Sequence, residues 1–305
     1  MKIRLSLGAL CFACLWVPSL FAQDLGPHVR KIKDGIYVYT VKPTPESTSN
    51  CGIIVTTEGV VLIDTGQTAV DTREVAEVVK KLTPLPVRFI IDTETHPDHT
   101  YGHFLFSPPA VVIGAEGAGA EMNQSYDPER WAKQTPEIQA AAKGFRLIPP
   151  QIEYGDKLTL RLGERTFELL NLGTVHSLAN TAIWLPSERV LFSASVAVPG
   201  QINTIRPHTN IADMFKVMDM MKALNPEVVI PGHGAPGGTE IFDNYERFLT
   251  LLLQRVGAMM REGKTLDQIK QELRMPEYEN LPGEKERIAN NYEAAYRAIQ
   301  GGFQR

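Results

Sequence analysis

Short apolar runs with the length of β-strands form two blocks, one on each side of Pro149-Pro150, and this pattern constrains the fold more than any other. Each run is rich in β-branched residues and bounded by turn residues. The runs lie at residues 35–40, 51–55, 59–64 and 87–91, and again at 157–162, 166–170, 181–185, 190–192 and 227–230. Two such blocks with helices beside them predict an α/β fold, in which two sheets pack face to face with helices outside.

Helical periodicity fills most of the remaining chain. Residues 70–82 and 211–224 each place apolar side chains on one face. Residues 110–148 are mixed, and we expect helix with a long loop there. Residues 241–261, 265–273 and 285–299 are three helical patterns with no strand between them. The sequence therefore predicts a main domain over residues 23–240 and a C-terminal helical appendix, residues 241–305, packed on it.

The N-terminus has the pattern of a secretory signal peptide. Lys2 and Arg4 precede an almost wholly apolar stretch, residues 5–22, that ends in small residues. A membrane anchor is the alternative, but 18 residues that include Pro18 are marginal for a span. We expect residues 1–22 to be removed and the mature protein to be periplasmic or secreted, without membrane association.

The charge pattern bears on the partner. The formal net charge is −4, and acidic and basic residues are interspersed. No basic stripe is present that would neutralise a phosphate backbone, so we expect no nucleic acid partner. A small-molecule substrate is expected instead, and the oligomeric state is left open.

A cluster of metal-ligand side chains follows the apolar run at residues 87–91. It comprises Glu94, His96, Asp98, His99 and His103. A hydrolytic zinc ion needs three protein ligands and an open position for water, and imidazole and carboxylate are suitable ligands. Two later histidines, His176 and His233, also follow apolar runs and lie in glycine-bearing loops. These residues predict one or two metal positions built from separate loops.

Four segments resemble the ordered motifs of the metallo-β-lactamase superfamily. They are residues 61–66 (VLIDTG), 94–102 (ETHPDHTYG), 173–176 (GTVH) and 231–234 (PGHG), and the resemblance extends over about residues 35–236. It implies a four-layer αββα sandwich. It also implies one metal held by Glu94, His96 and His176, and a second held by Asp98, His99 and His233.

The chain departs from the family pattern at two places. Glu94 stands where the family loop, H-x-H-x-D-H, has its first histidine. Ser195 stands where many members have an aspartate that bridges the metals, although one subclass of metallo-β-lactamases also has serine there. The resemblance implies Zn²⁺, one or two ions. Because a carboxylate is a harder ligand than imidazole, manganese or iron competes better with zinc at such a site.

The resemblance implies an exported hydrolase in which a metal-bound hydroxide attacks the carbonyl of a cyclic amide, ester or lactone, with a β-lactam as the most specific form. Asp98 would be both ligand and catalytic orienting group. The alternative is a catalytically weak, or iron- or manganese-dependent, protein of the same fold. Asp64 is a further candidate, as the partner of a ligating histidine. Candidates for residues that face the pocket or the substrate are Tyr101, His103, Ser195 and His208.

Overall fold

The strand-forming runs build two sheets in the computed structural model, which describes residues 24–40, 49–66, 68–127, 129, 133, 135–281 and 284–303. Within these residues, one sheet has seven strands in the order β1-β2-β3-β4-β5-β6-β7, and the other has five in the order β12-β11-β10-β9-β8. The predicted signal peptide, residues 1–22, lies outside the described residues.

The first sheet starts as an antiparallel meander and continues with parallel strands. Its strands are β1 (Val29–Lys33), β2 (Ile36–Tyr39), β3 (Cys51–Thr56), β4 (Gly59–Ile63), β5 (Val87–Ile91), β6 (Val111–Ala115) and β7 (Ile152–Tyr154). The second sheet is antiparallel except for its last pair. Its strands are β8 (Lys157–Leu162), β9 (Arg165–Gly173), β10 (Asn180–Leu185), β11 (Val190–Phe192) and β12 (Val228–Ile230).

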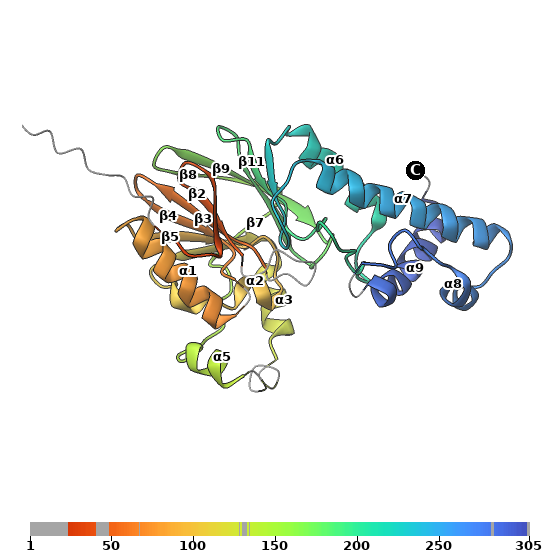
Figure 1. Ribbon diagram of the computed structural model, residues 1–305, viewed down its shortest axis with the longest axis horizontal. Helices are drawn as coiled ribbons and strands as arrows, with labels where there is room; N and C mark the ends of the chain where they lie inside the picture. The colour runs from red at the N-terminus through yellow and green to blue at the C-terminus, as the bar shows by residue number, and fades with distance from the viewer. Residues whose placement is uncertain are drawn as a thin grey trace, which may run out of the picture.

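The two sheets face each other across a buried apolar layer, with helices on the outer faces (Figure 1). Ile54 and Ile63 of the first sheet belong to the same buried cluster as Phe167 and Ile183 of the second. Helix α1 (Ala69–Leu82) covers the outer face of the first sheet, and α6 (Ile211–Ala223) covers that of the second. The predicted α/β sandwich with outer helices is confirmed.

The segment at residues 110–148 differs from the prediction. It begins with a strand, β6, that lies between β5 and β7. Four of its five residues are buried, which is usual for a parallel strand with both faces covered. Two short helices follow, α3 (Ala118–Ser125) and α5 (Pro136–Ala141). Strands β1 and β7 were not predicted either, because they are short and half exposed.

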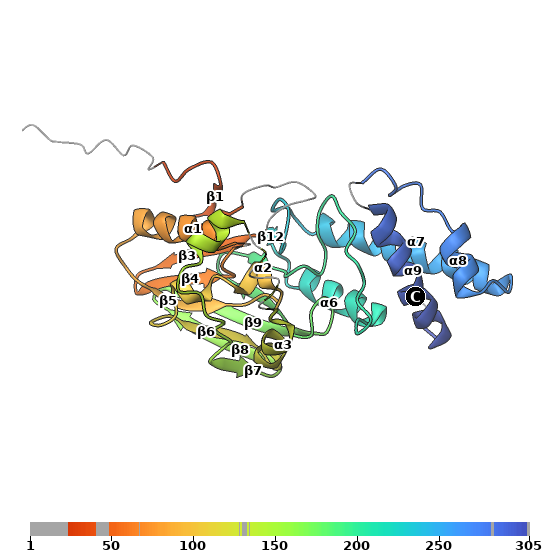
Figure 2. The same cartoon turned by 90° about the horizontal axis from the view of Figure 1, so that it is seen from below.

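The C-terminal helices form a lobe at one end of the sandwich (Figures 1 and 2). They are α7 (Glu240–Arg261), α8 (Leu266–Glu272) and α9 (Glu284–Gln300). Phe248, Leu252 and Val256 form the buried stripe of α7, and one apolar cluster runs from the outer face of the second sheet through α6 into this lobe. The three helices therefore pack against one another and join the sandwich through α6.

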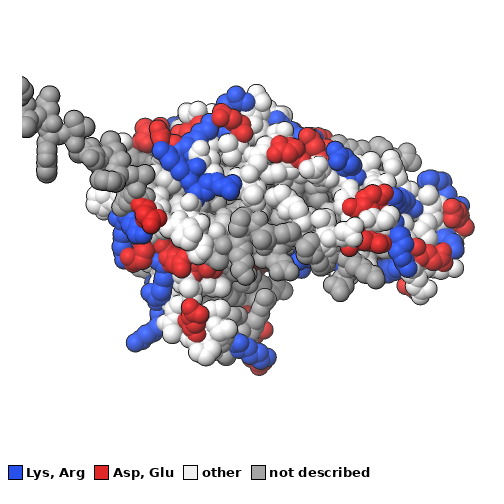
Figure 3. All heavy atoms as spheres, viewed as in Figure 1, with Lys and Arg blue, Asp and Glu red and all other residues white. Residues whose placement is uncertain are grey.

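The described surface carries charges of both signs. Figure 3 shows acidic and basic side chains interspersed over the face in view, with no extended field of one sign. In the part of the chain that the structure describes, no helix is both long enough and apolar enough to cross a membrane.

Candidate metal centre

Three loops bring the six predicted ligands together. Glu94, His96, Asp98 and His99 follow β5 of the first sheet, in a loop and the short helix α2 (Pro97–Thr100). His176 lies between β9 and β10, and His233 follows β12, both in the second sheet. The imidazole rings form two edge-to-face pairs, His96 with His176 and His99 with His233, at centroid separations of 4.9 and 5.1 Å. Each pair therefore takes one histidine from each sheet.

The carboxylate of Glu94 lies at the centre of this cluster. Its Oε1 is 2.8 Å from His96 Nδ1, 3.2 Å from His99 Nε2 and 3.4 Å from His176 Nε2. Its Oε2 accepts a hydrogen bond from the backbone N–H of Ser195, at 3.1 Å. The side chain is fully buried. Glu94 thus contacts a histidine of each pair.

Asp98 lies beside the second pair. Its Oδ2 is 3.2 Å from His233 Nε2 and 3.7 Å from His99 Nε2, and the two imidazole Nε2 atoms are 3.2 Å apart. The resemblance assigned this position to Asp98, His99 and His233. The structure adds Glu94, which is nearer to His99 than Asp98 is.

The donor set fits one or two transition-metal ions. Two groups of three residues each place their donor atoms within 4.8 Å of one another. One group is Glu94, His96 and His176, and the other is Glu94, His99 and His233. Two donors of a tetrahedral zinc ion, each roughly 2.0–2.1 Å from the metal, lie about 3.4 Å apart. Separations of 3.2 Å for His99–Glu94 and 3.4 Å for His176–Glu94 match this edge. Imidazole and carboxylate are also ligands that suit zinc, manganese or iron.

Electrostatics keep the acids ionised. Burial on its own would raise the pKa of Glu94, but His99 and His176 outweigh it and hold the pKa well below its usual range. His99 and His233 outweigh burial in the same way and lower the pKa of Asp98. Burial lowers the pKa of His99, yet Glu94, Asp64 and Asp98 together raise it to about 10. A cation and a proton therefore compete for the same His99 nitrogen.

Asp64 fixes the orientation of His99. It follows β4 with a positive φ of 57°, a conformation that aspartate tolerates better than most residues. Its carboxylate accepts hydrogen bonds from the backbone N–H and the hydroxyl of Thr93, at 2.8 and 2.6 Å, and from His99 Nδ1 at 2.8 Å. With Nδ1–H donated to Asp64, the Nε2 of a neutral His99 faces the cluster.

Polar contacts within and between the ligand loops hold these loops in place, and sequence reasoning missed all of them. The side chain of Asn50 donates to Pro231 O and Gly234 O, on either side of His233, and Ser49 Oγ donates to Asp98 O.

In the loop of His176, Asn180 Oδ1 accepts from the backbone N–H of Ser177. Glu121 of α3 accepts from Thr95 Oγ1 and from Leu178 N, so it joins the loop of His96 to the loop of His176. The partners of Ser49, Asn50 and Glu121 are 26 to 184 positions away, so no local motif marks these residues, whereas Asn180 bonds within its own loop.

His103 does not face the pocket, contrary to the expectation from sequence. It is buried, and its Nε2 lies 2.8 Å from Asp92 Oδ1 while its Nδ1 lies 2.8 Å from Ile148 O. Both ring nitrogens are therefore engaged by oxygens on the far side of the loop. His103 begins the 3-10 helix η1 (His103–Leu105), which follows α2, and its ring nitrogens meet Asp92 and Ile148 O instead of the other histidines.

The other three candidates lie around the cluster. Tyr101 is half-buried, and its ring contacts those of Tyr126 and Phe145. Ser195 touches Glu94 through its backbone, while its hydroxyl is buried with no hydrogen-bond partner among the described residues. His208 is exposed, and its Nε2 lies 3.4 Å from His176 O.

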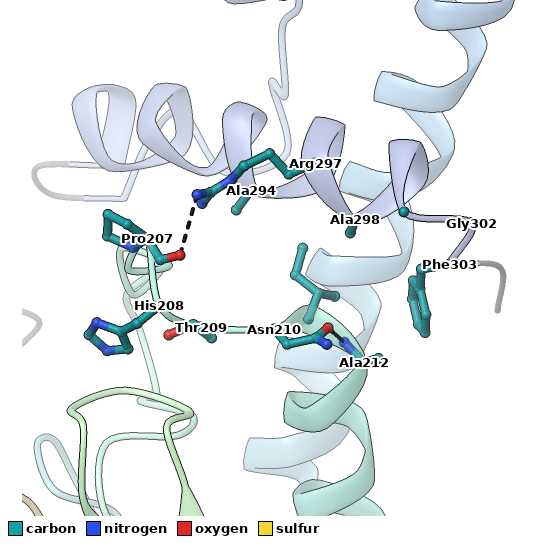
Figure 4. Close-up of a pocket in the computed structure, with 12 residues that line it drawn as sticks. Pro207, His208, Thr209, Asn210, Ala212, Ala294, Arg297, Ala298, Gly302 and Phe303 are labelled. Carbon is teal, nitrogen blue, oxygen red and sulfur yellow. Dashed lines mark hydrogen bonds between the residues drawn. The ribbon is translucent and has the colours of Figure 1, made fainter.

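The loop that carries His208 also borders a cavity of about 540 Å³. Figure 4 shows residues 207–212 below it and α9 above it, with Arg297 donating to Pro207 O at 3.3 Å. Arg206, in the same loop, is exposed. Burial lowers the pKa of His176 and outweighs the carboxylate of Glu94, which raises it, while the charges of His96 and Arg206 act in the same direction as burial. Sequence reasoning missed Arg206, an exposed cation two positions before His208 in the same loop.

Comparison with known proteins agrees with this geometry. A family model described as the metallo-beta-lactamase superfamily matches residues 44–233. A type 2 metallo-beta-lactamase of Bacteroides fragilis is 31% identical over 120 residues, which are 37% of this chain and 47% of that protein. The alpha subunit of 2,4-dinitroanisole O-demethylase from Nocardioides sp. (strain JS1661) is 25% identical over 219 residues, 72% of this chain and 58% of that protein. The chain spans about half the length of these curated relatives.

Solved structures share the fold. A stereoselective inverting sec-alkylsulfatase from Pseudomonas sp. has a TM-score of 0.67 at 18% identity, covering 90% of this chain and 50% of that one. A metallo-beta-lactamase from Pontibacter korlensis has a TM-score of 0.58 at 21% identity, covering 72% of this chain and 96% of that one. The alignment with the sec-alkylsulfatase covers 90% of this chain and so includes part of the C-terminal lobe. The alignment with the lactamase covers a smaller share of this chain, 72%.

Proposed function

The chain belongs to the metallo-beta-lactamase superfamily, and from this premise we propose that it is an exported, metal-dependent hydrolase of a cyclic amide, ester or lactone. One observation carries the proposal. Two imidazole pairs and two ionised carboxylates converge at the separations expected of donors around a metal ion. We propose zinc as the metal, because imidazole dominates the donor set.

The residues of the chain have separate tasks in this proposal. Glu94, His96 and His176 would hold one ion, and Asp98, His99 and His233 would hold a second. When bound, such ions polarise a substrate oxygen and make water more acidic. Asp64 keeps the Nε2 of His99 turned toward the centre, and Glu121 keeps the loops of His96 and His176 in register.

Side chains around the cluster support a substrate with an apolar body and a polar end. Tyr101, Tyr126 and Phe145 form a group of contacting rings beside the turn that carries Asp98 and His99. Contacting rings of this kind provide apolar contact area. His208 Nε2 lies 3.4 Å from His176 O, and Arg206 is exposed two positions earlier in the same loop, so both would contact an anionic or carbonyl group.

A substrate panel tests the proposal. The purified protein is freed of metal, loaded with Zn²⁺ and assayed against β-lactams, lactones, 4-nitrophenyl esters and alkyl sulfates. We expect zinc-dependent hydrolysis of at least one cyclic amide, ester or lactone, and its loss in the double variant His99→Gln/His233→Gln. Equal rates with and without zinc, or no turnover of any carbonyl substrate, would contradict the proposal.

Export is tested separately by fractionation. We expect the periplasmic or secreted fraction to contain a chain that begins at Gln23. A full-length chain confined to the cytoplasm would contradict this part of the proposal.

A sulfate ester is the second candidate substrate. It is favoured by the likeness to the sec-alkylsulfatase structure, which extends over 90% of the chain, and by the exposed cation Arg206 in the loop of His208. A linear primary-alkylsulfatase from Pseudomonas sp. (strain ATCC 19151) is also 21% identical over 261 residues. The alkyl sulfates in the panel distinguish the two candidates, because sulfate release without hydrolysis of any carbonyl compound would select the second.

A further inference from the structure

We propose that Glu94 is a ligand shared by both metal positions, so that one carboxylate serves two ions. This inference rests on the proposed two-ion site. It departs from the expectation that Glu94 serves only the position of His96 and His176.

The contacts of Glu94 carry the inference. Its Oε1 is 3.4 Å from His176 Nε2, a histidine of the first pair, and 3.2 Å from His99 Nε2, a histidine of the second. Both separations match the edge between donors on one tetrahedral ion, which is about 3.4 Å. The same carboxylate accordingly completes both candidate ligand sets.

Other carboxylates in the cluster are placed differently. Asp98 lies near His99 and His233, both of the second pair. Asp64 is turned to the Nδ1 side of His99 and to Thr93. Among the described residues, Glu94 is therefore the carboxylate that reaches a histidine of each pair. Ser195, where the chain has no acid, cannot supply this charge.

The backbone at Ser195 holds Glu94 in the shared position. Ala194 has a positive φ of 52°, which turns the N–H of Ser195 toward Glu94 Oε2, 3.1 Å away. One carboxylate oxygen is thus anchored, and the other points at the histidines. A fully buried carboxylate needs a compensating cation, and neutral ligating histidines do not provide one. Two ions on either side of Glu94 would compensate this charge.

Metal titration of paired variants tests the inference. Wild type, Glu94→Gln and His176→Gln are dialysed against zinc at a series of buffered free concentrations, and their zinc content is measured by mass spectrometry. His176→Gln removes one ligand of the first position and leaves Glu94 in place. We expect it to retain one ion with little change in affinity. We expect Glu94→Gln to bind both ions at least about tenfold more weakly, because a neutral amide then replaces the charged carboxylate at both positions.

Retention of one ion by Glu94→Gln with the affinity seen in His176→Gln would overturn the inference. A crystal structure of the zinc-loaded wild type provides a test that does not depend on either variant folding. We expect oxygen atoms of Glu94 to bond to both ions. Bonds from Glu94 to a single ion would overturn this inference and leave the proposed function intact. A wild-type protein that binds no zinc would instead overturn the metal site, and the proposed function with it.

Discussion

His99 and His103 differ in role because their ring nitrogens meet different partners. His99 donates through Nδ1 to Asp64 and turns Nε2 toward Glu94 and His233. His103 lies between Asp92 and Ile148 O, so neither of its nitrogens faces the cluster. Burial on its own lowers the pKa of His103, but the carboxylate of Asp92 outweighs this and raises the pKa above its usual value.

The sign of this shift gives a prediction for His103→Gln. A raised folded-state pKa stabilises the protein fully below the unfolded value of about 6.5, and the contribution disappears as pH rises through the folded-state pKa. We expect the variant to lose roughly 3 kcal/mol of unfolding free energy at pH 6, the scale for a broken buried pair, and less at pH 9. Urea denaturation at both pH values measures it.

His28→Gln is the matched control. His28 pairs with Glu74 in a partly exposed position, and such pairs contribute up to about 1 kcal/mol. Equal losses for His103→Gln at pH 6 and pH 9 would contradict the role of the charged pair.

The types of ligand residue were predictable from sequence, whereas the proposed sharing of Glu94 between two ions was not. Histidines and acids after apolar runs point to metal chemistry wherever the chain folds them together. Whether Glu94 serves one ion or two depends on the direction of its side chain, and Ser195, 101 positions away, sets that direction. The inward turn of His103 likewise depends on Ile148 O, 45 positions away.

At the scale of elements, α3 acts as a brace between two loops. Glu121 reaches from this helix to Thr95 and to Leu178, which flank ligands from different sheets. The sequence did not suggest this role, because residues 110–148 show no clear period and the strand before α3 was missed. Strands with strong β-branched runs, such as β3 and β4, were predicted to within a residue or two at each end.

Removal of this brace should weaken metal binding. We expect Glu121→Ala to lower zinc affinity by about 10- to 100-fold, as for other residues that hold ligands in place. Asn123→Ala is the control, since Asn123 lies on the same helix and donates to Gly119 O without touching the ligand loops. Zinc titration and thermal melting of both variants provide the comparison. An affinity for Glu121→Ala equal to that of the control would show that the brace does not act on the site.

At the scale of the whole molecule, the C-terminal lobe is connected to the metal cluster by hydrogen bonds. Asn291 of α9 is buried, accepts from Ile205 N at 2.7 Å and donates to Asn203 O at 2.8 Å. The side chain of Asn203 donates to Ser195 O, and Ser195 N donates to Glu94. The lobe therefore supports the loop that positions the central carboxylate, as well as burying its own apolar stripe.

This connection predicts a double effect of Asn291→Leu. We expect unfolding free energy to fall by about 1–3 kcal/mol, because two buried backbone groups lose their partner, and zinc affinity to fall with it. Glu293→Gln is the control on the same helix, where an exposed pair with Lys270 is broken. Denaturation and zinc titration are measured together. A destabilised Asn291→Leu variant with wild-type zinc affinity would show that the lobe only stabilises the fold.

The pairing of one histidine from each sheet has a consequence for folding. Neither sheet holds a complete ligand set, so an intermediate with only one sheet formed would bind an ion less tightly than the native protein. Metal would therefore bind after the sheets have docked and would stabilise the native state more than the folding transition state. Zinc should then slow unfolding far more than it speeds folding. The lifetime of the protein against proteolysis would then follow the supply of metal.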